Sequence, residues 1–184
     1  IVKDLTSYFT HYLQHKLPFL WEFHKVHHSA TVLNPITQYR IHPFELVLNN
    51  ITAILAFGLT TGFFDYLSFH QISEIEFLGA NVFSFIFLFF GANLRHSHVQ
   101  LKYLNWVENI FISPLQHQIH HSNNPIHFDK NLGAKLALWD WVFGTLIKSK
   151  SVKKLSFGLG NNQDVKYKSL LQNLYMPFLK IFKK

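Results

Sequence analysis

The sequence predicts an all-α integral membrane protein, in which a transmembrane helical hairpin carries a histidine-rich helical cap. Three observations lead to this fold class. Only 15% of the 184 residues are charged, whereas about 25% is usual for soluble domains. Two long apolar segments, 44–64 and 77–94, lie in the middle of the chain. Most of the 13 histidines form clusters before and after these segments.

The amino-terminal stretch IVKDLTSYF has neither an initiator methionine nor the pattern of a signal peptide. This pattern indicates that the chain begins inside a secondary-structure element. We therefore expect further sequence, with additional membrane helices, to precede it. The length predicts one domain, which we place at residues 1–147. Residues 148–184 then form a basic tail that ends in an amphipathic segment. This segment is expected either to lie on the membrane surface or to be an ordinary helix packed on the domain.

Composition excludes several classes of site. The chain has no cysteine, which rules out disulfides, thiolate metal sites and cysteine nucleophiles. The formal net charge of +7 is compatible with binding to nucleic acid or to an anionic membrane surface. Lysine and arginine lie only at or before Arg40 and at or after Arg95, and no nucleic-acid-binding motif accompanies them. We therefore expect no nucleic-acid partner.

The two apolar segments predict the hairpin. Segment 44–64 has the length of about 20 residues that a spanning helix needs. Segment 77–94 carries no charge and is apolar on every side. The linker 65–76 holds acidic residues and no cation, whereas both flanks hold cations, so the positive-inside rule places both flanks in the cytoplasm. A hairpin would bring the histidines before and after it to the same side. A pair of buried helices in a soluble domain is the alternative interpretation.

The histidines recur at helical spacing. The clusters are HYLQH at 11–15, HKVHH at 24–28, RHSHV at 95–99 and HQIHH at 117–121. Spacings of three and four residues place imidazoles on one side of a helix. Neutral imidazole is the commonest metal ligand among side chains, and it suits zinc, copper, iron and nickel. The clusters therefore predict a metal site.

The number of histidines predicts two metal ions. The clusters supply eight to ten candidate ligands, about twice what one tetrahedral ion takes. Neighbouring residues on a helix diverge by about 100°. We therefore expect His27 and His28 to serve different ions, and likewise His120 and His121.

Five motifs together resemble the fatty acid hydroxylase / sterol desaturase family of membrane di-iron enzymes: HYLQH, LWEFHKVHHS, RHSHV, SPLQHQIHHS and DKNLGAKLALWDWVFGTL. The resemblance covers roughly residues 4–147. It implies two iron ions, which zinc can replace in preparations. It also implies hydroxylation or desaturation of a C–H bond in a lipid such as a sterol or fatty acyl chain, with O2 and two electrons. The histidine boxes would face the cytoplasm, in the bacterial inner membrane or the endoplasmic reticulum.

Matched position by position, the resemblance implies nine metal ligands: His11, His15, His24, His27, His28, His96, His117, His120 and His121. Five more residues are expected to be a ligand or to orient one: His98, Asp4, Asp129, Asn131 and Asp140. His42 and His127 are expected to have structural roles. No catalytic residue beyond the metal ligands is predicted.

The partners follow from the same resemblance. They are a lipid substrate within the membrane, O2, and a separate electron donor, either cytochrome b5-like or a ferredoxin with its reductase. The alternative function is a non-redox membrane metal-binding protein, either a zinc carrier or a zinc hydrolase with histidine ligands. A carrier would place histidines within the spans, where this sequence has none. A hydrolase needs a general base, and only Glu22 accompanies the boxes.

Overall fold

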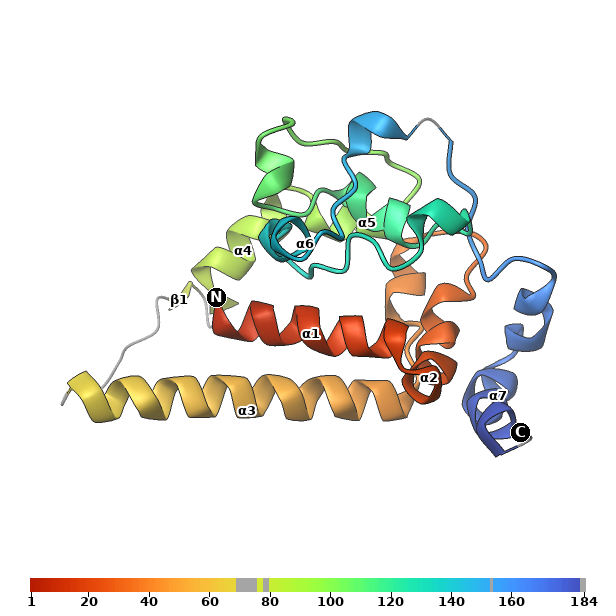
Figure 1. Cartoon of the computed structure of the whole chain (residues 1–184), viewed down its shortest axis with the longest axis horizontal. Helices are drawn as coiled ribbons and strands as arrows, with labels where there is room; N and C mark the ends of the chain where they lie inside the picture. Colours follow the sequence, from red (N-terminus) through yellow and green to blue (C-terminus); the bar gives the residue numbers. More distant parts are fainter. Residues whose placement is uncertain (69–75, 78–79, 153, 183–184) are drawn as a thin grey trace.

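The computed structural model describes residues 1–68, 76–77, 80–152 and 154–182 (Figure 1). Within these residues the chain is helical, as predicted, apart from loops and a two-residue antiparallel pairing of β1 (Glu76–Phe77) with β2 (Ala80–Asn81). The α-helices are α1 (Val2–Lys16), α2 (Pro18–His28), α3 (Pro43–Ser68), α4 (Val82–Phe89), α5 (Pro114–His120), α6 (Leu138–Val142) and α7 (Leu170–Phe182). The 3-10 turns are η1 (Pro35–Tyr39), η2 (Ala92–Arg95), η3 (Val107–Asn109), η4 (Pro125–His127), η5 (Ser149–Ser151) and η6 (Gln163–Tyr167).

The first two helices form a bent pair because of a proline. Pro18 starts α2 at a position that tolerates its missing N–H, and Leu17 before it is extended. The chain therefore turns between the first histidine cluster and the second. Helix α1 lies along α3 (Figure 1), and the amide of Gln14 donates to Asn49 Oδ1 on α3 at 2.9 Å. This bond fixes the first cluster against the base of the apolar helix.

Helix α3 contains the first predicted span. Within the described residues it is the one helix long and apolar enough to cross a membrane, over Pro43–Leu67. Its apolar side chains face outward, with Ile54 and Leu59 exposed to 69% and 73%. Exposed apolar side chains along a whole helix are typical of a surface that another apolar medium or partner covers.

The prediction of a second spanning helix over 77–94 is wrong in extent. Helix α4 has eight residues and is therefore roughly 12 Å long, whereas a bilayer core is about 30 Å thick. The β1–β2 pairing precedes it, and Gly91, with a φ of 94°, ends it in the left-handed region. The chain nevertheless returns to the histidine cap after α4 (Figure 1). Most of the linker 65–76, with His70, lies outside the described residues.

The cap consists of α5, α6 and the loops around them, on the side of α1 away from α3 (Figure 1). Helix α5 begins with a capping box, in which Ser113 and Gln116 bond each other's backbone N–H. The apolar side chains of Leu115 and Ile119 on α5 are fully buried. The tail continues from the cap, and α7 packs against α2. The burial of Leu115 and Ile119 anchors α5, so that the third histidine cluster points inward.

Candidate metal centre

The structure brings nine histidines into two adjacent groups, and they are the nine that the motifs singled out. In each group one ring nitrogen from every member lies within 4.8 Å of the others. The first group is His11, His15, His24, His28 and His120. The second group is His27, His96, His117 and His121. Adjacent histidines fall into different groups, His27 apart from His28 and His120 apart from His121. A turn of about 100° per residue along a helix requires this separation.

The Nε2 atoms converge within each group. In the first group His24 Nε2 lies 3.1 Å from His11 Nε2 and 3.2 Å from His28 Nε2. In the second, His117 Nε2 lies 3.2 Å from His96 Nε2 and 3.1 Å from His121 Nε2. Nitrogens bound to one ion at about 2.0–2.1 Å are about 3 Å apart. The spacing therefore fits a shared cation.

Two ring nitrogens of the first group have no hydrogen-bond partner. His15 Nε2 and His120 Nε2 are buried and unpaired. An unpaired buried polar atom is costly, and a metal ion would satisfy both. The donor set of neutral imidazoles suits iron as well as zinc. The residues present therefore fit a pair of metal ions, five imidazoles for one and four for the other.

Backbone carbonyls orient two of the rings from the other side. His11 Nδ1–H donates to the carbonyl of Leu132 at 2.7 Å, and His120 Nδ1–H donates to that of Lys130 at 2.9 Å. Each bond places the proton on Nδ1 and leaves the lone pair on Nε2, which faces the group. This arrangement of ligand and outer acceptor is usual around protein-bound metals.

The loop that supplies these carbonyls is held by two of the predicted polar residues. The Asp140 carboxylate accepts from the backbone N–H groups of Leu132 and Gly133, at 2.7 and 2.8 Å. The Asn131 amide donates to the carbonyl of Gln116 on α5 at 3.0 Å. Asp140 and Asn131 are both fully buried. Neither hydrogen-bonds a histidine, so both act on the rings through the backbone.

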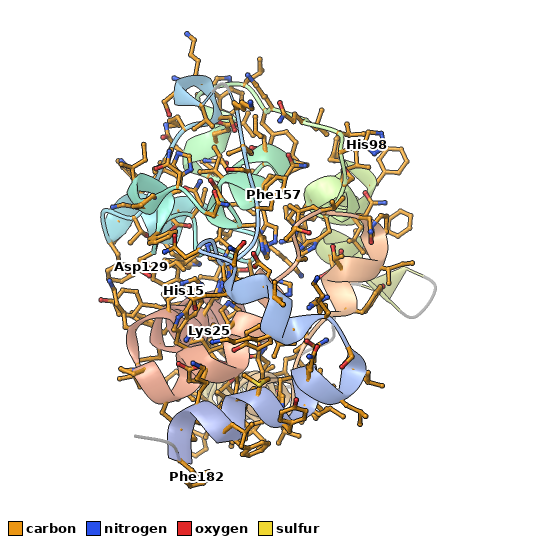
Figure 2. The ribbon with its side chains drawn as sticks, turned by 90° about the vertical axis from the view of Figure 1, so that its right-hand side faces the viewer. His15, Lys25, His98, Asp129, Phe157 and Phe182 are labelled. Carbon is orange, nitrogen blue, oxygen red and sulfur yellow. The ribbon has the colours of Figure 1, made fainter. Side chains whose placement is uncertain are left out.

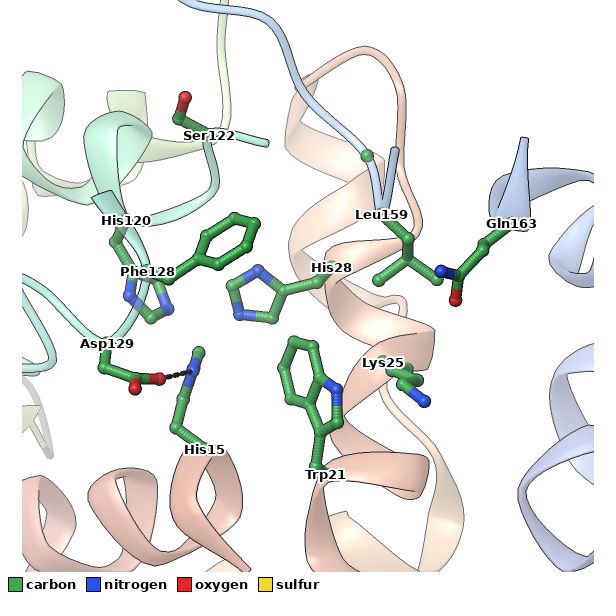
Figure 3. Close-up of a pocket in the computed structure, with 11 residues that line it drawn as sticks. His15, Trp21, Lys25, His28, His120, Ser122, Phe128, Asp129, Leu159 and Gln163 are labelled. Atoms are coloured by element: carbon green, nitrogen blue, oxygen red, sulfur yellow. Dashed lines mark ion pairs between the residues drawn. The ribbon is translucent and has the colours of Figure 1, made fainter. Parts of the chain in front are cut away.

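The other two predicted acids differ from one another. Asp129 Oδ1 lies 3.4 Å from His15 Nδ1 (Figure 3). The second carboxylate oxygen of Asp129 pairs with Lys16. The Asp4 carboxylate accepts from the indole N–H of Trp139 at 2.9 Å. It also accepts from the backbone N–H groups of Lys135 and Leu136 in the cap. Asp4 makes no hydrogen bond to a histidine. It joins α1 to the cap instead, and its predicted role in orienting a ligand stays a prediction.

Glu45 is a partner that sequence reasoning missed. His24 Nδ1–H donates to Glu45 Oε1 at 2.8 Å, and both side chains are almost fully buried. Glu45 lies in the first turn of α3, where the sequence showed only one charge near the start of an apolar segment. The sequence did offer a signal for this contact: an acid at the start of an apolar segment, three residues after His42.

The second group has its own outer partners. Thr37 Oγ1 donates its proton to the carbonyl of Asn34 at 2.7 Å, so it accepts from His96 Nδ1–H at 3.1 Å. His27 Nδ1–H donates to the carbonyl of Arg40 at 3.3 Å. Both partners belong to η1 and the residue after it, a segment to which the sequence analysis assigned no role.

Three histidines stay outside the two groups among the described residues. His98 is exposed at the edge of the cap, far from His15 (Figure 2). His96, two residues earlier, is buried and faces the second group, and the chain bends between the two after η2 ends at Arg95. His42 Nε2–H donates to the carbonyl of Leu174 at 3.1 Å, which is a structural role. His127 is buried but joins neither group.

Burial keeps the gathered imidazoles neutral. It lowers the pKa of His11 to about 3, with the nearby His24 as the second cause, and it lowers the pKa of His24 to about 3 as well. In the second group burial lowers the pKa of His96 to about 4. At neutral pH all three rings are therefore in the unprotonated form that binds metal.

A cavity of about 360 Å³ opens beside the first group. His15, His28 and His120 point into it, and Trp21 and Phe128 flank them (Figure 3). The cavity therefore gives access to the first group.

Nine imidazoles in two groups, contributed by α1, α2 and the cap and lying next to a long apolar helix, form a candidate histidine-box metal site. The chain belongs to the fatty acid hydroxylase family, because the model of that family matches residues 1–145. It is 27% identical to an alkylglycerol monooxygenase of Danio rerio over 96% of the chain and 35% of that protein. It is 28% identical to the alkylglycerol monooxygenase of Caenorhabditis elegans, over 96% of the chain and 30% of that protein.

A bacterial relative is named for a different lipid. The chain is 27% identical to the ornithine lipid hydroxylase OlsE of Rhizobium tropici, over 97% of the chain and 48% of that protein. The chain thus spans about a third to a half of the length of these relatives. No solved structure matches it.

Proposed function

We propose that this protein is a membrane di-iron oxygenase that hydroxylates a C–H bond of a lipid, with O2 and two electrons. The observation that carries the proposal is the pair of adjacent histidine groups whose Nε2 atoms converge at 3.1–3.2 Å. Family membership and the lipid-hydroxylating relatives support the substrate class. Desaturation needs the same centre and remains the second possible outcome of the reaction.

The residues of this chain would have distinct tasks. Five imidazoles would hold one iron ion and four the other. When bound, the iron pair supplies the O2 chemistry that oxidises an unactivated C–H bond. Glu45 and the carbonyls of Lys130 and Leu132 keep protons on Nδ1, so that Nε2 stays free. Trp21 and Phe128 restrict water beside the first group.

Helix α3 would anchor the protein in the bilayer. Its length, its apolar composition and its exposed apolar side chains support this. The positive-inside rule favours a cytoplasmic position for the histidine boxes, in a bacterial inner membrane or in the endoplasmic reticulum. The lipid would approach from the bilayer along α3.

Electrons would come from a separate protein. The sequence contains neither cysteine nor a GxGxxG fingerprint, so a cytochrome b5-like protein or a ferredoxin with its reductase is the proposed donor. The net charge of +7 would favour a donor with an acidic docking surface.

The test is a lipid comparison in cells. The protein, with any preceding sequence, is expressed in a host that supplies lipids and electron donors, and extracted lipids are analysed by mass spectrometry. We expect a lipid species that has gained one oxygen, and its absence with His120→Ala. A species that has lost two hydrogens instead would indicate desaturation. Identical lipid profiles for the iron-loaded wild-type protein and for His120→Ala would overturn the proposal and favour a non-redox zinc protein.

A further inference from the structure

The outer partners of His27 and His96 come from one short segment of the chain. This segment, residues 34–40, consists of η1 with the residue on either side of it. Its Thr37 hydroxyl accepts from His96, and its Arg40 carbonyl accepts from His27. The outer acceptors of the first group lie elsewhere, on the cap loop and on α3. A displacement of segment 34–40 would therefore disturb the second group in particular.

The internal hydrogen bonds of segment 34–40 shape it without attaching it to the histidine-bearing helices. The side chain of Asn34 accepts from the backbone N–H groups of Ile36 and Thr37, which closes the turn. The backbone N–H of Arg40 donates to the carbonyl of Thr37 at 3.2 Å. The segment lies at the surface, where Ile36 is exposed to 81%. Its position relative to the second group must therefore be fixed by contacts with other elements.

The Arg40 guanidinium ties segment 34–40 to the end of α2. Its Nε donates to the carbonyl of Val26 at 3.0 Å and to Ser29 Oγ at 3.1 Å, and its Nη2 donates to Ser29 Oγ at 2.8 Å. Val26 and Ser29 lie on either side of His27, at the carboxyl end of α2. Carbonyls in the last turn of a helix lack intrahelical partners, and a cation there also interacts favourably with the helix dipole.

The same guanidinium reaches the carboxy-terminal tail. Nη2 of Arg40 donates to the backbone carbonyl of Tyr167 and, at 3.4 Å, to Asn173 Oδ1. Tyr167 is the buried last residue of η6, and Asn173 lies on α7. The next residue of α7, Leu174, accepts from His42 Nε2–H at 3.1 Å. The tail therefore holds the chain at Arg40 and again at His42, where α7 packs beside α2 (Figure 1).

We propose that Arg40 is a positioning residue for the second metal group, and that the tail acts on this group through Arg40. The guanidinium keeps the Arg40 carbonyl and the Thr37 hydroxyl where they hold protons on Nδ1 of His27 and His96, which leaves the other ring nitrogen to the metal. Its planar fork bonds α2 and the tail at once, and a lysine ammonium does not reproduce this geometry. The proposal rests on the function proposed above, since it assumes that the second group holds a metal ion.

The experiment measures metal affinity one group at a time. His15→Ala removes a ligand of the first group, so that the remaining ion reports on the second group, and His117→Ala does the reverse. Neither histidine hydrogen-bonds segment 34–40. The full chain in detergent is loaded with zinc, which binds imidazoles without redox chemistry, and is then titrated with a competing chelator. His120→Ala, also in the first group, replaces His15→Ala if that protein does not fold.

Arg40→Lys is expected to act on one background only. Added to His15→Ala, it should lower zinc affinity about tenfold or more, the usual cost of losing an outer partner of a ligating histidine. Added to His117→Ala, it should leave zinc affinity unchanged. Lys168→Ala, an exposed cation next to Tyr167, is the control and should change neither. Equal losses in both backgrounds would mark Arg40 as a residue that stabilises the whole fold, and no loss in either would exclude a role; each result would overturn the proposal.

A matched pair of variants tests the part of the tail. Asn173→Leu removes an acceptor of Arg40, whereas Asn173→Asp keeps it and adds a charge that strengthens a bond to a guanidinium. In the His15→Ala background, we expect Asn173→Leu to weaken zinc binding and Asn173→Asp to keep it at least at the level of the background. With Arg40→Met, which has no donor, the two should no longer differ. A difference that persists would overturn the action of the tail through Arg40.

Lipid analysis in cells separates this proposal from the oxygenase. Selective loss of the second zinc ion in Arg40→Lys, together with no oxidised lipid from the wild-type protein, would overturn the oxygenase and support the role of Arg40. Oxidised lipid from the wild-type protein, together with zinc affinity in Arg40→Lys that equals the background, would overturn the role of Arg40 alone.

Discussion

His24 of the second histidine box donates its Nδ1–H to Glu45 in the first turn of α3, at 2.8 Å. The bond is shielded from water, since the two side chains are exposed by only 3% and 4%. It joins the imidazole at the centre of the first group to the base of the apolar helix. The orientation of His24 Nε2 therefore depends on a residue outside the histidine boxes.

Removal of this acceptor is expected to weaken metal binding. Glu45→Ala should lower metal affinity about 10–100-fold, the usual cost of losing an outer partner of a ligating histidine. Metal retention during competition with a graded chelator measures the effect. Glu108→Gln is the control, since Glu108 is also buried but its side chain bonds Ser113 and Ser149. Equal retention by Glu45→Ala and the wild-type protein would contradict the role of Glu45.

Gly133 is expected to be essential for the loop that orients His11. A Cβ at this position would lie 2.4 Å from the carbonyl oxygen of Leu136 and 2.8 Å from Asp140 Oδ2. Gly133→Ala should therefore shift the loop, lower the free energy of unfolding by about 1–3 kcal/mol and reduce metal content. Thermal unfolding and metal analysis check this. Gly62→Ala is the control, because nothing lies within 4 Å of its Cβ; similar behaviour of both variants would refute the prediction.

His98 and His96 are expected to respond differently to substitution. His98 is exposed and outside both groups, whereas His96 is buried in the second. His98→Ala should keep the full metal content, and His96→Ala should lose metal from the second group. Elemental analysis of the two purified variants is sufficient. Loss of metal in His98→Ala would restore His98 as a ligand.

The metal-free protein is expected to lose stability in acid. The folded pKa values of His11 and His24 are about 3 and that of His96 about 4, below the ordinary 6.5 that applies to the unfolded chain. Below pH 6.5 the unfolded chain therefore binds more protons, and this favours unfolding. Stability should be full above about pH 6.5 and fall steadily as the pH drops toward 3. An unfolding midpoint that is unchanged between pH 7.5 and 5 would contradict this.

The histidine groups illustrate what helical spacing can predict. Spacing of three and four residues determines which imidazoles share a face, and the divergence of adjacent residues separates His27 from His28. The structure brings the nine histidines together in this manner, and their binding of metal stays a prediction. Spacing could not decide whether His98 is a ligand. Its outward position depends on how the chain after η2 packs in the tertiary structure.

Other features depended on contacts that a sequence does not display. Asp4 and Asp140 were predicted to orient ligands, yet both accept from backbone N–H groups of one loop. The carbonyl of Leu132 that holds His11 has no side-chain signature at all. An apolar run likewise does not fix helix length, since the β1–β2 pairing and Gly91 limit α4 to eight residues.

The number of metal ions per chain tests the central claim most directly. Protein purified without chelator is analysed for metals and for protein concentration, together with His28→Ala and His27→Ala. The two-group arrangement predicts about two iron ions per wild-type chain and about one in each variant, because the two histidines belong to different groups. One ion or fewer in the wild-type protein after iron loading would contradict a pair of separately held metals. Two ions kept in either variant, or both ions lost in either variant, would contradict it as well.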